Sequence, residues 1–383
     1  MLQKDDILFA RTGGTVGKSF LVNDVPYPSI YAGYLIRTRY SNMLSAQYMK
    51  YFMECELYWE QLRNGTIATA QPNCNGKTLA KMILPIPPYN EQIRITDKLN
   101  QVLESVRKYG ESQDRLDKLN IQIHDLLKKS ILQEAIQGRL VPQNASEEPA
   151  SLLLQRIKDE KMRLVKEGKL KKKDVVDSTI FRGDDNKYFE KKGKEIVCID
   201  DEIPFEIPET WAWVRLDDIC EYIQRGKSPK YSPIKKYPVV AQKCNQWSGF
   251  SIEKAKFIVP ETISSYGEDR ILQDRDLLWN STGLGTLGRM AIYYSKLNPY
   301  ELAVADSHVT VIRAFKDYIL PEYLYAYFTS YTVQSVIEDK SDGSTKQKEL
   351  ATSTVKVYLV PLPPYEEQRR IVKRIDEVSA YLM

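Results

Sequence analysis

A repeat of apolar side chains, three and four positions apart, predicts one long helix over residues 89–137. Two prolines precede this stretch, and Gly138 and Pro142 follow it, as is usual at the start and the end of a helix. An apolar seam kept over several heptads is typical of a coiled coil. Its members are Ile95, Leu99, Val102, Val106, Leu116, Ile123 and Leu127.

A second, shorter seam with the same spacing is formed by Ile371, Ile375 and Val378 near the C-terminus. Because a long helix cannot bury its seam against itself, we expect the two helices to pack on each other as a coiled coil. A pseudo-two-fold axis would then relate the parts of the chain that precede them. The alternative is that each helix packs on its own domain.

The stretch before each helix is repeated, as "ILPIPPYNEQIRI" at 83–95 and "LVPLPPYEEQRRI" at 359–371. Further upstream, "DDILFARTGGTVGK" at 5–18 resembles "RDLLWNSTGLGTLGR" at 275–289. Two copies at this separation indicate two related domains and not a solenoid. The first copy begins close to Met1 and the second helix stops at the last residue, so we expect a chain that is truncated at both ends.

The predicted fold class is α+β, with globular mixed α/β domains linked by long coiled-coil helices and an internal pseudo-two-fold repeat. Between the first helix and the second copy, the pattern predicts a charged helix over Ser146–Gly168 and then a polar linker. The predicted divisions are a partial first globular domain (1–88), the long helix (89–140), the charged helix and linker (141–202), a second globular domain (203–363) and the start of a second helix (364–383).

Composition changes this picture little. The net charge of the 383 residues is +4, so only local charge can indicate a nucleic-acid partner. The five cysteines contain no CxxC spacing, which predicts reduced thiols in a cytoplasmic protein. No apolar run approaches the roughly 18 residues of a membrane span, so no membrane association is expected.

Catalytic chemistry is not predicted. The stretch "GGTVGKS" has Thr12 where a phosphate-binding loop needs its first glycine. Ile86 and Leu362 precede the two "PPY" runs, and neither side chain can hydrogen-bond a base. The two histidines, His124 and His308, lie in no acid–base pair or metal cluster. We therefore expect a binding protein without catalytic residues, metal or cofactor of its own.

Residues 225–256 form a basic stretch, in which eight Lys or Arg residues against one Glu give a net charge of +7. Lys and Arg suit phosphates, whereas Asn, Gln and Arg suit the edges of bases, so the stretch predicts DNA binding. The alternative is a solvated basic surface. Loops at 280–289 and 342–349 mix glycine with hydroxyl, amide and basic side chains and are expected to contribute.

Within this prediction the residues have different roles. The phosphate-binding candidates are Arg225, Lys227, Lys230, Lys235, Lys236 and Lys243. The candidates for base contact are Asn245, Gln246, Asn280, Arg289 and Gln347. Tyr231 and Lys346 complete the predicted DNA-binding set.

The whole pattern resembles the specificity (S) subunit of type I restriction-modification enzymes. The motifs that carry this resemblance are the doubled "P-x-PPY-x-EQ-x-RI", the "TG…GT-x-G-[KR]" loops, "KSILQEAIQGRLVPQ" at 129–143 and "IPETWAWVRLDDI" at 207–219. The resemblance implies target recognition domains that each bind one half of a bipartite site on double-stranded DNA. It also implies an antiparallel coiled coil that sets the gap between the half-sites.

The resemblance further implies partners. Two methyltransferase subunits and the restriction subunits would assemble with the chain, and S-adenosylmethionine, ATP and Mg would bind in those subunits. Two other functions stay open from the residues alone. One is an adenine methyltransferase with built-in recognition domains, and the other is a coiled-coil scaffold without a DNA role.

Overall fold

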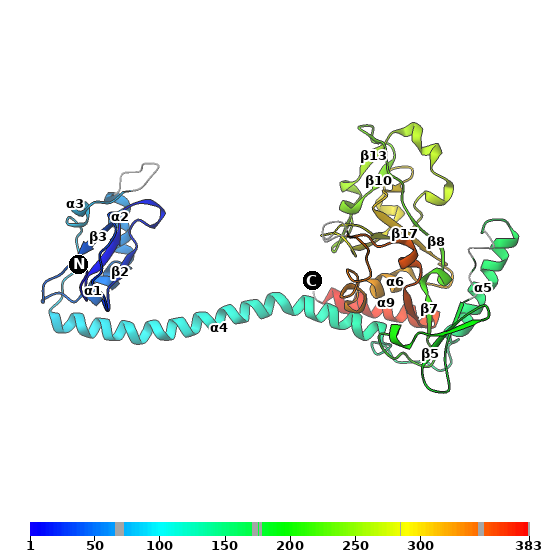
Figure 1. The fold of residues 1–383 in the computed structure, drawn as a ribbon, viewed down its shortest axis with the longest axis horizontal. Coiled ribbons are helices and arrows are strands. Elements are labelled where there is room, and N and C mark those ends of the chain that lie inside the picture. The colour runs from blue at the N-terminus through cyan, green and yellow to red at the C-terminus, as the bar shows by residue number, and fades with distance from the viewer. Residues whose placement is uncertain (66–72, 171–174, 176–177, 284, 344–347, 382–383) are drawn as a thin grey trace. The chain divides into compact units, whose positions relative to one another are not determined.

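A computed structural model describes residues 1–383 except for 66–72, 171–174, 176–177, 284, 344–347 and 382–383 (Figure 1). The chain forms two compact units, Met1–Asn120 and Ile121–Met383. Each unit mixes sheet and helix, which confirms the α+β class.

The first unit is built on a three-stranded antiparallel sheet in the order β2-β1-β3. Ile7 and Phe9 alternate along the central strand and are fully buried, because one face of the sheet packs on helices that supply Phe52 and Tyr58. The elements are β1 (Ile7–Ala10), β2 (Ser19–Leu21), β3 (Leu35–Thr38), α1 (Ala46–Phe52), α2 (Glu56–Gly65), α3 (Gly76–Leu79) and the first part of α4 (Tyr89–Ile136).

The second unit contains a four-stranded antiparallel sheet in the order β15-β14-β17-β8. Its strands are β8 (Cys220–Arg225), β14 (Asp276–Asn280), β15 (Met290–Tyr293) and β17 (Val309–Ala314). Both faces of β14 are buried, because Leu277 and Trp279 face the main core whereas Leu278 faces a second apolar cluster. Burial is therefore continuous along β14, whereas it alternates along β1.

Helices and smaller sheets surround this central sheet. One four-stranded sheet, in the order β16-β10-β13-β9, lies at the end of the unit away from α9 (Figure 1). The helices are α5 (Ala150–Lys166), α6 (Pro321–Phe328), α7 (Tyr331–Gln334), α8 (Thr352–Lys356) and α9 (Tyr365–Ala380). The remaining strands are β7 (Ala212–Arg215), β9 (Tyr231–Ser232), β10 (Pro238–Val240), β11 (Asn245–Gln246), β12 (Gly249–Phe250), β13 (Lys256–Ile258), β16 (Val304–Ala305) and β18 (Leu359–Leu362).

The linker predicted after the charged helix is wrong for residues 178–198. These residues form a three-stranded antiparallel sheet of β4 (Ser178–Arg182), β5 (Tyr188–Lys192) and β6 (Glu195–Cys198). One face of this sheet carries Tyr188, in a cluster beside Trp213, and the other carries the stacked rings of Phe181 and Phe189. Apolar and charged residues thus occur on both faces, so the sequence shows no simple alternation.

The long helix itself is confirmed, since α4 runs from Tyr89 to Ile136 and Gly138 follows it at a φ of +70°. Its seam, however, is exposed from Val102 to Leu127. The C-terminal end of α4 instead joins the main core through Ala135 and Ile136.

The second predicted seam contributes to the main core of its unit. Ile371 of α9 is fully buried there and Ile375 packs against that core, whereas Ile123 of α4 is 56% exposed. The same core contains Ala135 and Ile136 from the end of α4. An a/d pattern does not specify which apolar surface covers it, so the pairing of the two seams stays a prediction.

The repeated Gln of the "PPY-x-EQ" stretch ties a helix to its own domain in both units. The Oε1 atom of Gln92 accepts a hydrogen bond from the backbone N–H of Ser45 at 2.8 Å, and that of Gln368 accepts one from Leu320 at 2.8 Å. Each amide nitrogen also donates to the carbonyl of a proline five residues earlier. The repeated stretch is thus a clamp that holds the start of a helix against the preceding loop.

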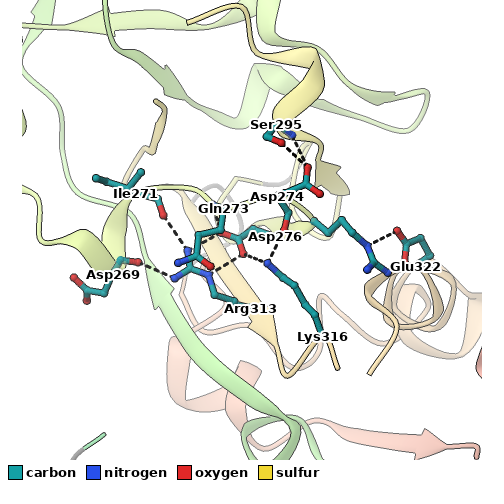
Figure 2. A network of polar contacts seen from close by, with 10 residues as sticks. Asp269, Ile271, Gln273, Asp274, Asp276, Ser295, Arg313, Lys316 and Glu322 are labelled. Atoms are coloured by element: carbon teal, nitrogen blue, oxygen red, sulfur yellow. Dashed lines mark hydrogen bonds and ion pairs between the residues drawn. The ribbon is translucent and has the colours of Figure 1, made fainter. Parts of the chain in front are cut away.

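A repeated ion pair marks the start of the central strand. Arg313 donates to both carboxylate oxygens of Asp276 at 2.9 and 2.7 Å, and Lys316 approaches the same carboxylate at 3.5 Å (Figure 2). In the first unit, Arg39 donates to both oxygens of Asp6 at 2.9 and 3.3 Å. The second copy is more enclosed, since the side chain of Arg313 is 5% exposed and that of Arg39 is 48% exposed.

The second glycine of each "GT-x-G" loop has a backbone conformation that suits glycine. Gly17 has a φ of +93° and Gly288 a φ of +85°. A Cβ atom would meet the side chains of Trp59 and Leu62 in the first case and that of Gln334 in the second. Both the backbone and the close packing therefore require glycine here. These glycines thus have a structural reason that does not involve a bound phosphate.

The two sheets differ at one edge. In the second unit β8 pairs with β17, but among the described residues of the first unit β3 pairs with β1 alone. The outer face of the first sheet also lacks the cover that Val240 and Leu272 give to Leu278, and Phe20 on that face is 64% exposed.

Candidate nucleic-acid interface

Several loops of the second unit meet at one edge of its central sheet. Strands β14 and β8 end there and β17 begins there, because Asn280 pairs with Val309 and Arg225 pairs with Thr310. Loops at such a strand end can vary without changing the core. We call this region the loop edge and define it by Arg225, Gln242, Gln246, Thr282, Arg289 and His308.

A hydrogen-bonded cluster lies at the centre of the loop edge. The amide nitrogen of Gln242 donates to the carbonyl of Thr282 at 2.5 Å and to Thr286 Oγ1 at 2.9 Å. Thr282 Oγ1 in turn lies 2.9 Å from Nδ1 of His308. The three loops are therefore held together by polar side chains, which can also present donors and acceptors to a ligand.

His308 does not belong to a catalytic triad. Asp306 accepts a hydrogen bond from the backbone N–H of His308 at 2.9 Å, whereas the Nδ1 atom of the ring contacts Thr282. In a triad the carboxylate orients the ring, so this geometry gives no activated nucleophile. His308 immediately precedes β17.

Arg225 is positioned at the loop edge but is already engaged. Its Nε atom donates to the carbonyl of Ser307 at 2.7 Å, and its Nη1 atom pairs with Glu349. A Cβ atom at the next residue, Gly226, would overlap the backbone of Ala305. Arg225 can contact a phosphate only if Glu349 is displaced or shared.

Arg289 and Gln246 connect two further loops. Arg289 Nη1 donates to Gln246 Oε1 at 3.2 Å, and its Nη2 atom donates to the carbonyl of Gly285 at 2.5 Å. Gln246 donates in turn to the carbonyl of Lys243 at 2.8 Å. Both side chains are partly exposed, as a base-contacting pair requires, and Lys243 beside them is exposed.

The predicted base contacts of Asn245 and Asn280 are wrong. Both residues are fully buried, and Asn245 donates to Asn280 Oδ1 at 2.9 Å and to the carbonyl of Leu278 at 3.2 Å. They join the β11–β12 hairpin to β14. An amide side chain suits a base edge, but its residue type does not reveal whether it is exposed.

The other predicted cations are exposed but spread over the unit. Lys236 lies over the ring of Tyr237 at 4.9 Å, in the β9–β10 connection at the end of the unit away from α9 (Figure 1). Lys227 donates to the carbonyl of Ser265 at 3.2 Å. Lys230 and Lys235 are exposed as well.

Tyr231 links this outer sheet to the loop edge. Its hydroxyl donates to Asp306 at 3.1 Å, and Lys256 lies 4.7 Å from its ring centroid. Burial and the neighbouring Asp306 carboxylate raise the pKa of Tyr231, so the phenol stays neutral and able to donate a hydrogen bond.

Lys346 and Gln347 lie outside the described residues. The sequence analysis did not include Gln242, Thr282 and His308 among its site residues, although the structure brings them together. The Gly- and Thr-rich sequence of the loop at 280–289 could have indicated this cluster, because it marks the strand end where the three residues meet.

Two general findings concern the described part of the chain. None of its helices combines the length and the apolar character that a membrane crossing needs. Within the same residues, no group of three or more His, Cys, Asp and Glu side chains is arranged to hold a metal ion.

The sequence model of the family described as "Type I restriction modification DNA specificity domain" matches residues 1–123 and 208–383. The specificity subunit of the type I restriction enzyme EcoAI from Escherichia coli is 30% identical over 299 residues, which cover 74% of this chain and 45% of that protein. The EcoBI specificity subunit from the same organism is 23% identical over 329 residues, which cover 85% of this chain and 57% of that protein.

The chain thus spans about half the length of the curated relatives it matches. A solved structure from a study of complex assembly and conformational transition in the type I R-M system is similar in fold. Its TM-score is 0.54 at 16% identity, with 100% of this chain and 75% of that chain covered.

Proposed function

Because the chain belongs to the type I restriction-modification DNA specificity family, we propose that its second unit binds duplex DNA through the loop edge and selects part of a target sequence. Relatives in this family are named specificity subunits, which agrees with a non-catalytic chain. In this proposal the chain contributes recognition, and the chemistry on DNA belongs to other subunits.

One observation supports the loop edge above the rest of the surface. It combines exposed Lys243 with the partly exposed pair of Arg289 and Gln246 on loops that leave the end of a rigid sheet. Cations there can position phosphates, while the guanidinium and the amides can meet base edges in a groove. The cluster of Gln242, Thr282 and His308 fixes the loops so that little ordering is needed on binding.

The partners follow from the same proposal. Two methyltransferase subunits and the restriction subunits would assemble on the chain, and S-adenosylmethionine, ATP and Mg would bind in them. We also propose a cytoplasmic location. The exposed seam of α4 in the first unit, from Val102 to Leu116, offers an apolar surface for such an assembly.

The test is the affinity of the full chain for duplex DNA as a function of salt concentration. We expect the double variant Lys235→Glu/Lys236→Glu to bind all sequences more weakly and to show a shallower salt dependence. Lys243→Glu should act in the same way and more strongly, because Lys243 lies beside the loop edge. Each lost phosphate contact should reduce the slope by about 0.9.

The matched control is Lys373→Glu on α9, where the side chain is 79% exposed and lies on a helix distant in sequence from the loop edge. Its affinity and salt slope should equal those of the wild type. If the wild-type chain showed no salt-dependent retention on DNA, or if all the variants bound alike, the proposed DNA-binding role of this surface would be wrong.

A further inference from the structure

Trp247 lies at a turn position, where other residue types are preferred. The two-residue turn between β11 and β12 consists of Trp247 and Ser248, since Gln246 pairs with Gly249. Turn positions favour Gly, Asn, Asp, Pro and Ser, which satisfy turn geometry or hydrogen-bond locally. The indole does neither, and Trp247 is 55% exposed.

The hairpin that carries Trp247 is rigidly anchored at its base. Asn245 is fully buried and bonds to Leu278 and Asn280 of β14. On the other strand, Phe250 packs edge-on against Tyr293 with ring centroids 5.4 Å apart. A fixed base and an exposed tip mean that the indole is presented without loss of much conformational freedom on binding.

The surroundings of the tip are those of the loop edge. Gln246, directly before Trp247, accepts from Arg289 at 3.2 Å and donates to the carbonyl of Lys243 at 2.8 Å. An exposed apolar ring that directly follows a residue bonded to Arg289 and Lys243 matches the chemistry of nucleic acid, where bases offer flat apolar faces and the backbone offers phosphates.

We propose that Trp247 is an aromatic wedge that stacks on the face of a base when the second unit binds DNA. This inference rests on the proposed function and adds a contact to it. Aromatic wedges between base steps stabilise a locally opened or kinked duplex, and stacking does not release counterions. Trp247 should therefore contribute affinity that does not depend on salt, unlike the lysines around it.

The experiment compares the full wild-type chain with Trp247→Ala, Trp247→Phe and the control Tyr331→Ala, whose ring is 64% exposed on α7. The probes are a short matched duplex and the same duplex with one unpaired base, over a range of salt concentrations. An unpaired base costs less to unstack, so a wedge should bind that duplex more tightly.

We expect Trp247→Ala to lose about tenfold in affinity with an unchanged salt slope, and to lose the preference for the unpaired base. Trp247→Phe should keep most of both, and Tyr331→Ala should equal the wild type. Among the described tryptophans, Trp247 is the exposed one, so DNA should quench the fluorescence of the wild type and not that of Trp247→Phe.

If Trp247→Ala kept the wild-type affinity and the preference for the duplex with an unpaired base, the wedge proposal would be overturned and the proposed function would stay intact. Normal DNA binding by this variant combined with lost binding of a methyltransferase subunit would also overturn the wedge, because the indole would then be a protein contact. If the wild-type chain failed to bind either duplex, the proposed function itself would fail. If Trp247→Ala did not fold, equal DNA binding by Trp247→Phe and Trp247→Leu would overturn the wedge.

Discussion

At the scale of single residues, the repeated ion pair allows a direct comparison of one interaction at two levels of burial. We expect Arg313→Ala to lower the free energy of unfolding by about 3–5 kcal/mol, because it leaves Asp276 buried without its main partner. Arg39→Ala should cost much less, since Arg39 is half exposed and Arg37 stays 3.8 Å from Asp6. Chemical denaturation measures both, and equal losses would contradict this argument.

A second residue-scale prediction concerns Asp218, in the 3-10 turn between β7 and β8. Burial raises the pKa of Asp218 to about 7, against the opposing charge of Lys161. A carboxyl with a raised pKa in the folded state contributes stability that is fully present below its ordinary pKa of 3.8 and is lost as the pH rises through 7.

The variant Asp218→Asn cannot ionise. Its unfolding free energy relative to that of the wild type should therefore rise by about 2 kcal/mol between pH 5 and pH 8. Denaturation curves at both pH values give this difference. The comparison uses the change with pH, because the loss of the Asp218 charge also affects Lys161 at any single pH. A constant difference between the two proteins would show that Asp218 is ionised throughout.

At the same scale, the structure brings together some of the predicted site residues and buries others. Lys243, Gln246 and Arg289 do meet at one edge, because the stretches that carry them flank a strand end. Asn245 and Asn280 have equally suitable side chains but bond to each other in the interior. Whether a polar residue in a short strand faces solvent depends on tertiary packing, which a single sequence does not contain.

At the scale of elements, the two apolar seams behave in opposite ways. Ile371→Ala should destabilise the second unit by about 2–5 kcal/mol, because Ile371 is fully buried in the main core. Ile123→Ala in the same unit should change the unfolding free energy by no more than about 0.5 kcal/mol, because Ile123 is 56% exposed. A large loss for Ile123→Ala would show that the α4 seam is covered in the isolated chain.

The sequence pattern predicted the limits of α4 almost to the residue. Its apolar period, the prolines before it and Gly138 after it are local signals, and local signals determine where a helix begins and ends. The partner of the seam is a non-local property. The β4–β5–β6 sheet was not predicted, because apolar and charged residues occur on both of its faces and give no simple alternation.

At the scale of the whole molecule, the β3 edge of the first sheet has no paired strand among the described residues, and Phe20 on the outer face of that sheet is exposed. Open edges and apolar faces promote association between chains. We expect the isolated chain to associate as its concentration rises, and Phe20→Lys to shift that association to higher concentration. Sedimentation velocity provides the measurement.

The matched control for association is Tyr331→Lys, because Phe20 and Tyr331 are each 64% exposed and lie in different units. The same shift for both variants would mean that added charge, and not the face around β3, controls association. A wild-type chain that stayed monomeric at all concentrations would contradict the prediction outright.

The clamps made by Gln92 and Gln368 have a consequence for how domains could be exchanged. Each clamp bonds only to its own globular part, Gln92 to Ser45 and Gln368 to Leu320. The two stretches match closely, so a foreign globular domain that ends in the same stretch could be joined there to either helix. Such a fusion should keep the hydrogen bonds that fix the start of the helix, because both partners of those bonds come from the transferred part.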